Sequence, residues 1–174
     1  DEGENVEIGS HTHTELAQLA QNAGAVFSNN SWGGIGNGPY TAASAEFDAL
    51  VRDSDPGEPG NQQISYFFCA GNEGPDVGTT RAQASAKNVV SAGAHENSDA
   101  DGVDGSGFLP THADNMRDIS PGSSRGPTAD GRLGVTVVAT GTHVQGAAST
   151  ADGYTGAHVS DKFWPTNQTD YCRS

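Results

Sequence analysis

The asparagine at position 72 is the residue of this sequence whose type and place most favour catalytic chemistry. It follows an apolar run over residues 64–70 and lies in a turn bounded by Gly71 and Gly74. Polar residues at the carboxyl end of a buried parallel strand lie where α/β proteins place their sites. A side-chain amide there can donate a hydrogen bond to an oxygen that gains negative charge during a reaction. Asparagine also caps turns, so this segment alone leaves a catalytic and a purely structural interpretation open.

The apolar pattern along the chain predicts the elements that would position this turn. Apolar runs predict strands over residues 25–30, 64–70, 88–94 and 134–139. Apolar residues at helical spacing predict one helix over 15–23, with Thr14 as its N-cap and Gly24 after its end, and another over 41–52. The last three strands are apolar almost throughout, which is typical of strands buried on both faces of a parallel sheet. The expected fold class is α/β, with a parallel sheet flanked by helices.

Negative charge is the strongest feature of the composition. The 174 residues include 22 Asp and Glu but only 8 Lys and Arg, for a formal net charge of −14. Such a chain repels phosphate backbones and anionic membranes, so we expect no nucleic acid and no membrane among its partners. The charge instead favours cation binding or a high-salt habitat. No apolar stretch approaches the ~18 residues of a membrane-spanning helix.

The two cysteines, Cys69 and Cys172, fit no metal-binding spacing. We expect two unpaired thiols, with a disulfide between them as the alternative. The length fits one domain or part of a larger one. Residues 1–5 have no signal-peptide character and resemble the interior of a protein rather than a natural start.

Several short segments together resemble, in order, the motifs of subtilisin-like serine proteases (subtilases, peptidase family S8). They are residues 29–34 (NNSWGG), 69–75 (CAGNEGP), 86–94 (AKNVVSAGA), 123–127 (SSRGP) with 130–132 (DGR), and 139–142 (ATGT). The layout is most similar to the large alkaline subtilases that carry a C-terminal β-sandwich. The resemblance implies a three-layer subtilisin-like fold that is incomplete in this chain. Residues 1–174 would then be a partial catalytic domain, the segment between the His and Ser motifs, with an acidic insert at about 96–107.

The resemblance also implies roles for the matching residues. Asn72 would be the oxyanion-hole asparagine of a peptidase that acts on a peptide or protein substrate. Pairing with the extended substrate and forming the wall of its side-chain pocket would fall to Ser31, Trp32, Gly33, Ala70 and Gly71. Glu73 would lie at the rim of that pocket and favour a basic or polar substrate side chain. For Trp32 and Phe68, plain core packing is the alternative. The family further implies an extracellular, secreted protein.

The Asp, His and Ser motifs of the subtilase triad do not occur in these 174 residues. Residues 141–146 imitate the His motif, but Thr140 occupies the place of the catalytic histidine, and 103–107 imitate the Asp motif only faintly. His11 and His13 match no motif, so we expect surface histidines. We therefore expect a serine endopeptidase segment that is inactive alone and needs the remainder of the protease chain as its partner. The alternatives are a non-catalytic pseudo-peptidase and a calcium-dependent acidic binding module.

The acidic insert contains part of a calcium-loop pattern. Asn97, Asp99 and Asp101 place oxygen ligands at positions 1, 3 and 5 of such a loop, and Gly102 follows at position 6. Asp104 offers a further oxygen, whereas position 12 is Phe108 instead of the usual Glu. The segment is therefore either a possible calcium site or a solvated acidic loop. No organic cofactor is expected.

Overall fold

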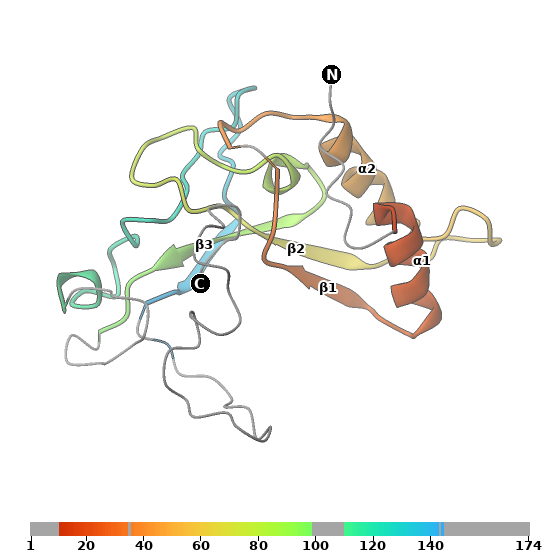
Figure 1. Cartoon of the computed structure of the whole chain (residues 1–174), viewed down its shortest axis with the longest axis horizontal. Coiled ribbons are helices and arrows are strands. Elements are labelled where there is room, and N and C mark those ends of the chain that lie inside the picture. Colours follow the sequence, from red (N-terminus) through yellow and green to blue (C-terminus); the bar gives the residue numbers. More distant parts are fainter. Residues whose placement is uncertain (1–10, 35, 99–109, 143, 145–174) are drawn as a thin grey trace.

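The computed structural model describes residues 11–34, 36–98, 110–142 and 144 of the chain. Its centre is a four-stranded parallel sheet in the order β1-β2-β3-β4 (Figure 1). The strands are β1 (Phe27–Asn30), β2 (Ser65–Cys69), β3 (Val90–His95) and β4 (Val137–Thr140). The register pairs Phe27 with Ser65, Phe67 with Val90, and Ala92 with Val137. The predicted parallel α/β sheet is confirmed.

Two helices precede the strands β1 and β2. Helix α1 (His13–Asn22) begins at Thr12, which forms a capping box with Glu15, and it ends before Gly24 at φ 82°. The predicted N-cap Thr14 is therefore wrong by two residues, because only Thr12 has the glutamate three positions later that closes the capping box. Helix α2 (Ala42–Leu50) begins at Thr41, which forms a capping box with Ser44.

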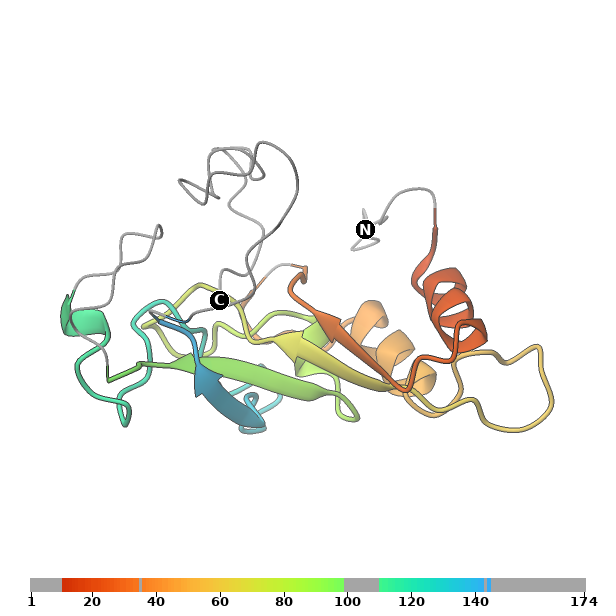
Figure 2. The same cartoon turned by 90° about the horizontal axis from the view of Figure 1, so that it is seen from below.

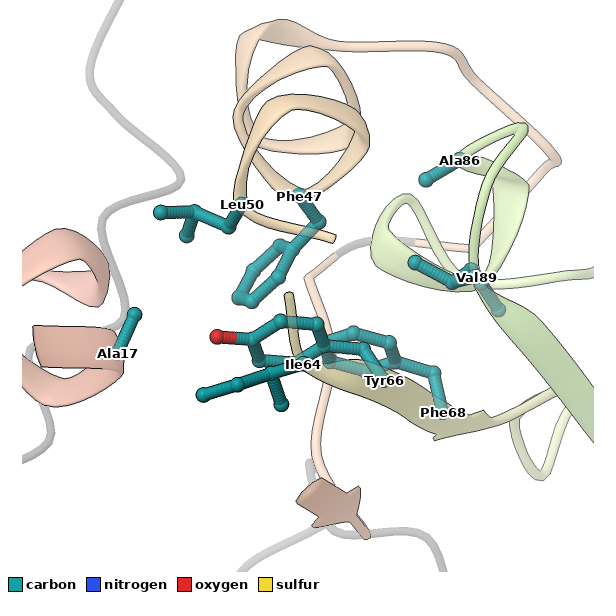
Figure 3. Packing of buried hydrophobic residues seen from close by; sticks show 9 residues of the cluster. Ala17, Phe47, Leu50, Ile64, Tyr66, Phe68, Ala86 and Val89 are labelled. Carbon is teal, nitrogen blue, oxygen red and sulfur yellow. The ribbon is translucent and has the colours of Figure 1, made fainter. Parts of the chain in front are cut away.

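The core lies between α2 and one face of the sheet (Figure 3). The Phe47 ring packs edge-on against Phe68 at a centroid distance of 4.7 Å and against Tyr66 at 5.3 Å. Ala17 of α1 and the residues around the 3₁₀ helix η1 (Gln83–Ser85) complete the cluster. Phe68 is 1% exposed, so core packing is confirmed for this residue. Truncating a buried phenylalanine of this kind typically costs about 3–5 kcal/mol.

The opposite face of the sheet is exposed within the described residues. Side chains alternate between buried and exposed along β2, and Phe67 is 36% exposed, while Phe27 on β1 is 63% exposed. Every residue of β4 is exposed. The expected burial on both faces is therefore wrong for β2 and β4 in this part of the chain, because α1, α2 and η1 all pack against the face that carries Tyr66 and Phe68.

The chain extends from α1 beside β1 to the 3₁₀ helix η2 (Pro110–His112) at the far end of the molecule (Figures 1 and 2). Residues 113–136, between η2 and β4, contain no helix or strand. A search of the described residues finds no helix that is both long and apolar enough to span a membrane.

Candidate functional site

The turn that follows β2 is held by backbone hydrogen bonds on both sides. The Ala70 N–H donates to the Ala92 carbonyl at 2.8 Å, and the Ala70 carbonyl accepts from the Arg81 N–H at 2.9 Å. The Gly71 carbonyl accepts from the Ser124 N–H at 3.0 Å. Ala70 is 1% exposed. The turn therefore leaves the sheet at a fixed point, between Ala92 of β3 and the segment that contains Ser124.

Glycine is required at position 71 by both backbone conformation and packing. Gly71 adopts φ 121°, and a Cβ atom there would lie 2.5 Å from Ser124 Oγ and 2.6 Å from Glu73 Oε2. The next glycine, Gly74, is packed as tightly, because its Cβ would lie 2.3 Å from the Ser123 carbonyl oxygen. The backbone of residues 71–74 therefore packs directly against residues 121–124, so that two of the segments that resemble family motifs are in contact here.

The Glu73 carboxylate is the centre of the hydrogen bonds in this turn. Its Oε1 forms an ion pair with the Arg81 guanidinium. Its Oε2 accepts from the Asn72 backbone N–H at 3.0 Å and from the Ser124 hydroxyl at 2.9 Å. The Glu73 N–H in turn donates to Ser124 Oγ at 3.0 Å. The backbone on both sides of the Asn72 side chain is therefore fixed, and Asn72 itself is half-buried.

Arg81 connects this turn to the segment that follows β1. Its side chain is 6% exposed, and its Nη1 donates to the carbonyls of Gly33 at 3.3 Å and Gly34 at 3.1 Å. The Gly34 N–H donates to the buried Gln83 side chain at 2.7 Å. One buried guanidinium thus binds both the Glu73 carboxylate and the 33–34 backbone. The structure in this way brings together three predicted site segments, at 31–33, 70–71 and 72–73.

Trp32 packs on the core while its neighbours differ in exposure. The indole stacks on the His13 ring at 5.4 Å with an interplanar angle of 20°, and Phe68 contacts it edge-on at 5.3 Å. Trp32 is half-buried, Ser31 is exposed and Gly33 is buried. Core packing thus accounts for much of the Trp32 side chain, and the backbone of 33–34 is what Arg81 positions.

The expectation of surface histidines holds for His11, whose side chain is 50% exposed, and is wrong for His13. His13 is 5% exposed, and its Nδ1 lies 2.8 Å from Glu46 Oε2. The cause is its place at the start of α1, four residues before the buried Ala17 and therefore on the same face of the helix. The four-residue spacing between His13 and Ala17 was the signal in the sequence that could have identified His13 as buried.

The predicted calcium ligands Asp99, Asp101 and Asp104 lie outside the described residues, as do residues 103–107 and Cys172. The expectation of an unpaired thiol is wrong for Cys69, which is not a free cysteine in the structure. Asn97 is described, and its amide oxygen accepts from the Ser98 N–H at 2.9 Å, while its own N–H donates to Thr142 Oγ1 at 2.9 Å. Asn97 therefore already contributes hydrogen bonds that fix the chain after β3. The calcium prediction for this segment remains a prediction.

Sequence reasoning missed Arg81 and the role of Ser124. Arg81 is the one charged residue in the small, otherwise uncharged stretch 79–86, which is the signal that could have indicated a buried ion pair. Nothing in the sequence identifies Glu73 as its partner, because no helix or strand lies between the two residues to fix their separation. The other contacts join distant positions, since Ser124 and Glu73 are 51 positions apart and Gly33 precedes Arg81 by 48.

In a comparison with protein families, residues 4–172 match the model described as the subtilase family. The match extends past the motif segments at 29–142 in both directions. No curated protein sequence matches the chain significantly.

Proposed function

The chain belongs to the subtilase family, and from this premise we propose that it supplies the substrate-binding strand and the oxyanion asparagine of a serine endopeptidase. Subtilases are peptidases, so the substrate is a peptide or protein. The observation that carries the proposal is the contact of Arg81 with both Glu73 and the 33–34 backbone. It joins the segment proposed to bind substrate to the turn that carries Asn72.

The chemistry proposed for Asn72 is electrostatic stabilisation of the tetrahedral intermediate. A preorganised side-chain N–H stabilises the oxyanion because it needs no reorientation when charge develops on the substrate oxygen. The fixed backbone of Gly71 and Glu73 supports this role for Asn72. An extended substrate would pair with the segment of Ser31, Trp32 and Gly33 by strand addition, with Ala70 and Gly71 forming a wall of the side-chain pocket.

Glu73 enters the proposal mainly as a positioning residue. Its carboxylate binds Arg81, Ser124 and the Asn72 N–H, and its side chain is still 39% exposed. A basic substrate side chain at the pocket rim would compete with Arg81 for this carboxylate. We therefore expect only a weak preference for basic substrate residues.

The proposed partner is the remainder of the protease chain, which would carry the Asp, His and Ser of the triad. The exposed sheet face supports this part of the proposal. A shallow hollow lined by Val26, Phe27, Asn29, Ser65 and Phe67 lies on that face, and exposed apolar surface of this kind is typical of an interaction site. The family also supports secretion into the extracellular space.

A test compares the 174-residue chain with the longer protease chain that contains it. A fluorophosphonate probe should label the longer chain and leave the 174 residues at their 17.8 kDa mass. In the longer chain, Asn72→Ala should lower kcat by about 10²–10³-fold, the loss known for the oxyanion asparagine of subtilisin itself, with KM nearly unchanged. Asn61→Ala, at an exposed asparagine in the turn before β2, is the matched control. Equal effects of the two substitutions would contradict the proposed role of Asn72, and a longer chain without labelling would favour a pseudo-peptidase.

A further inference from the structure

Arg81 lies between the two segments that are proposed to enclose the substrate side chain. A Cβ atom on Gly33 would lie 3.0 Å from Arg81 Cβ and 3.4 Å from its Cδ. On the other side, a Cβ atom on Gly71 would lie 2.9 Å from Arg81 Cγ. The aliphatic stem of Arg81 is therefore packed against both segments at once, and it fills the space between them.

Hydrogen bonds hold the backbone and the head group of Arg81 in this place. Its N–H donates to the Ala70 carbonyl at 2.9 Å, and its carbonyl accepts from the Ser85 N–H at 3.0 Å. Its Nη1 donates to the carbonyls of Gly33 and Gly34. The side chain is 6% exposed. A substrate group that displaced it would have to break several of these contacts, so Arg81 stays in place when substrate binds.

The ion pair with Glu73 balances the charge at the rim of this space. Glu73 Oε1 binds the Arg81 guanidinium, while Oε2 accepts from the Asn72 N–H and the Ser124 hydroxyl. A substrate carboxylate would have to displace Glu73 from Arg81, and a substrate ammonium would have to displace Arg81 from Glu73. Either exchange breaks a pair whose arginine is buried, which is costly. Charged substrate side chains therefore gain little here.

Size and charge together define the substrate class. We propose that Arg81 restricts the substrate residue before the scissile bond to small, uncharged side chains, those of glycine, alanine and serine. The inference rests on the proposed function, because it takes residues 31–33 and 70–71 as the walls of the pocket. A large side chain meets a space that the arginine stem already fills, and overfilling a packed space is unfavourable. A small side chain needs only the rim and leaves the ion pair intact.

Two substitutions separate the volume of Arg81 from its charge. Arg81→Met keeps a long side chain and removes the charge, so large apolar residues stay excluded while the unpaired Glu73 carboxylate attracts basic ones. Arg81→Ala removes both volume and charge, so large apolar and basic side chains enter. A change of even one methylene in the fit of a side-chain pocket alters kcat/KM by about 10–200-fold, and we expect changes of at least about tenfold.

The test uses the longer protease chain and peptides that differ only in the residue before the scissile bond: alanine, serine, phenylalanine, lysine or glutamate. In the parent, kcat/KM should be at least about tenfold higher for alanine and serine than for the others, with lysine only weakly above glutamate. Arg81→Ala should raise the phenylalanine-to-alanine ratio, and Arg81→Met only the lysine-to-alanine ratio. Arg132→Ala, at an arginine paired with the exposed Asp130, is the control and should keep every ratio.

Ratios within one enzyme are independent of how much of each variant is folded, so a loss of stability in Arg81→Ala does not obscure the result. A parent that cleaves after phenylalanine as fast as after alanine would overturn the inference, as would unchanged ratios in both Arg81 variants. A preference for glutamate would also overturn it, and would show that a substrate carboxylate binds Arg81, whose Nε is buried with no partner among the described residues.

A separate measurement distinguishes failure of this inference from failure of the proposed peptidase function. If the longer chain hydrolyses none of the peptides, the proposed catalysis is wrong, and the same order is then measured by calorimetry on peptides that end in the tested residue. Tighter binding of peptides ending in alanine or serine, with the order changed by Arg81→Ala, would still support the role of Arg81. Equal affinities for all of these peptides would overturn it.

Discussion

The pair formed by Arg81 and Glu73 gives the sharpest test of how the site is held together. Arg81 is the buried member, with a side chain 6% exposed, whereas the Glu73 side chain is 39% exposed. We expect Glu73→Gln to be more destabilising than Arg81→Met, although Glu73 is the more exposed residue. The reason is that each substitution leaves the other partner behind, and only one of the two can be hydrated where it lies.

The magnitudes follow from what remains after each change. Glu73→Gln leaves a buried guanidinium with uncharged acceptors, and we expect a loss of about 3 kcal/mol, the lower end of the range for breaking a buried pair, because the glutamine oxygen still accepts a hydrogen bond. Arg81→Met leaves a carboxylate that reaches water and keeps its bonds to Asn72 and Ser124, so we expect a loss of about 1–2 kcal/mol. The double variant should be more stable than Glu73→Gln alone.

Urea unfolding followed by tryptophan fluorescence measures these differences, since Trp32 packs on the core beside the site. The control is Arg132→Gln, which removes the exposed partner of Asp130 and leaves side chains that are about a third or more exposed. An exposed pair contributes little, and the hydrogen bond of Arg132 to the Ser85 carbonyl at 2.7 Å, which is also lost, contributes about 1 kcal/mol. The unfolding midpoint of the control should therefore fall much less than that of Glu73→Gln. If Arg81→Met proved as costly as Glu73→Gln, the contacts of Arg81 with carbonyls would explain the site and the ion-pair argument would fail.

Two further predictions concern an exposed carboxyl and two glycines. A side-chain hydrogen bond from Arg132 lowers the pKa of Asp130 to about 2, so its stabilising contribution is present above the unfolded-state pKa and is lost as the pH falls toward 2. An NMR titration should show this midpoint, and Arg132→Gln should raise it toward 3.8. Gly71→Ala should cost roughly 3 kcal/mol or more, since its Cβ would lie 2.5 Å from Ser124 Oγ. Gly131→Ala, at φ 84° with nothing within 4 Å of its Cβ, should cost only the roughly 1–2 kcal/mol of the left-handed backbone, and urea unfolding compares the two.

The sequence was enough to predict the strands and their parallel arrangement because both depend on local patterns. Short apolar runs between turn residues located all four strands to within a few residues. Burial could not be predicted in the same way. Phe27 and Phe67 are apolar although the described structure leaves them exposed, so their strands lack the alternation that normally identifies an exposed face.

The same distinction between local patterns and contacts formed only in the folded chain applies to the candidate site. The turn that carries Gly71 and Asn72 could be located because a glycine and a polar residue at the end of an apolar run indicate a turn after a strand, while the catalytic role of Asn72 stays a prediction. The ion pair of Arg81 with Glu73 could not be predicted, because no helix or strand between the two residues fixes their separation. The contacts of Arg81 with Gly33 and Gly34 could not either, because these residues meet only in the folded chain. His13 lies between these cases, since its helical spacing was visible while its stacking partner Trp32 was not.

The ion pair also bears on how an acidic chain could carry the proposed oxyanion site. A net charge of −14 and a carboxylate one residue after Asn72 both oppose negative charge on a nearby substrate oxygen. Arg81 is one of only 8 basic residues, and its guanidinium neutralises that carboxylate inside the protein, where electrostatic interactions are strongest. The Glu73 carboxylate can therefore fix the Asn72 backbone by hydrogen bonding without adding its full charge to the field at the proposed oxyanion. In the longer protease chain proposed above, Arg81→Met should therefore reduce kcat as well as stability, because it leaves an uncompensated negative charge beside the amide proposed to stabilise the oxyanion.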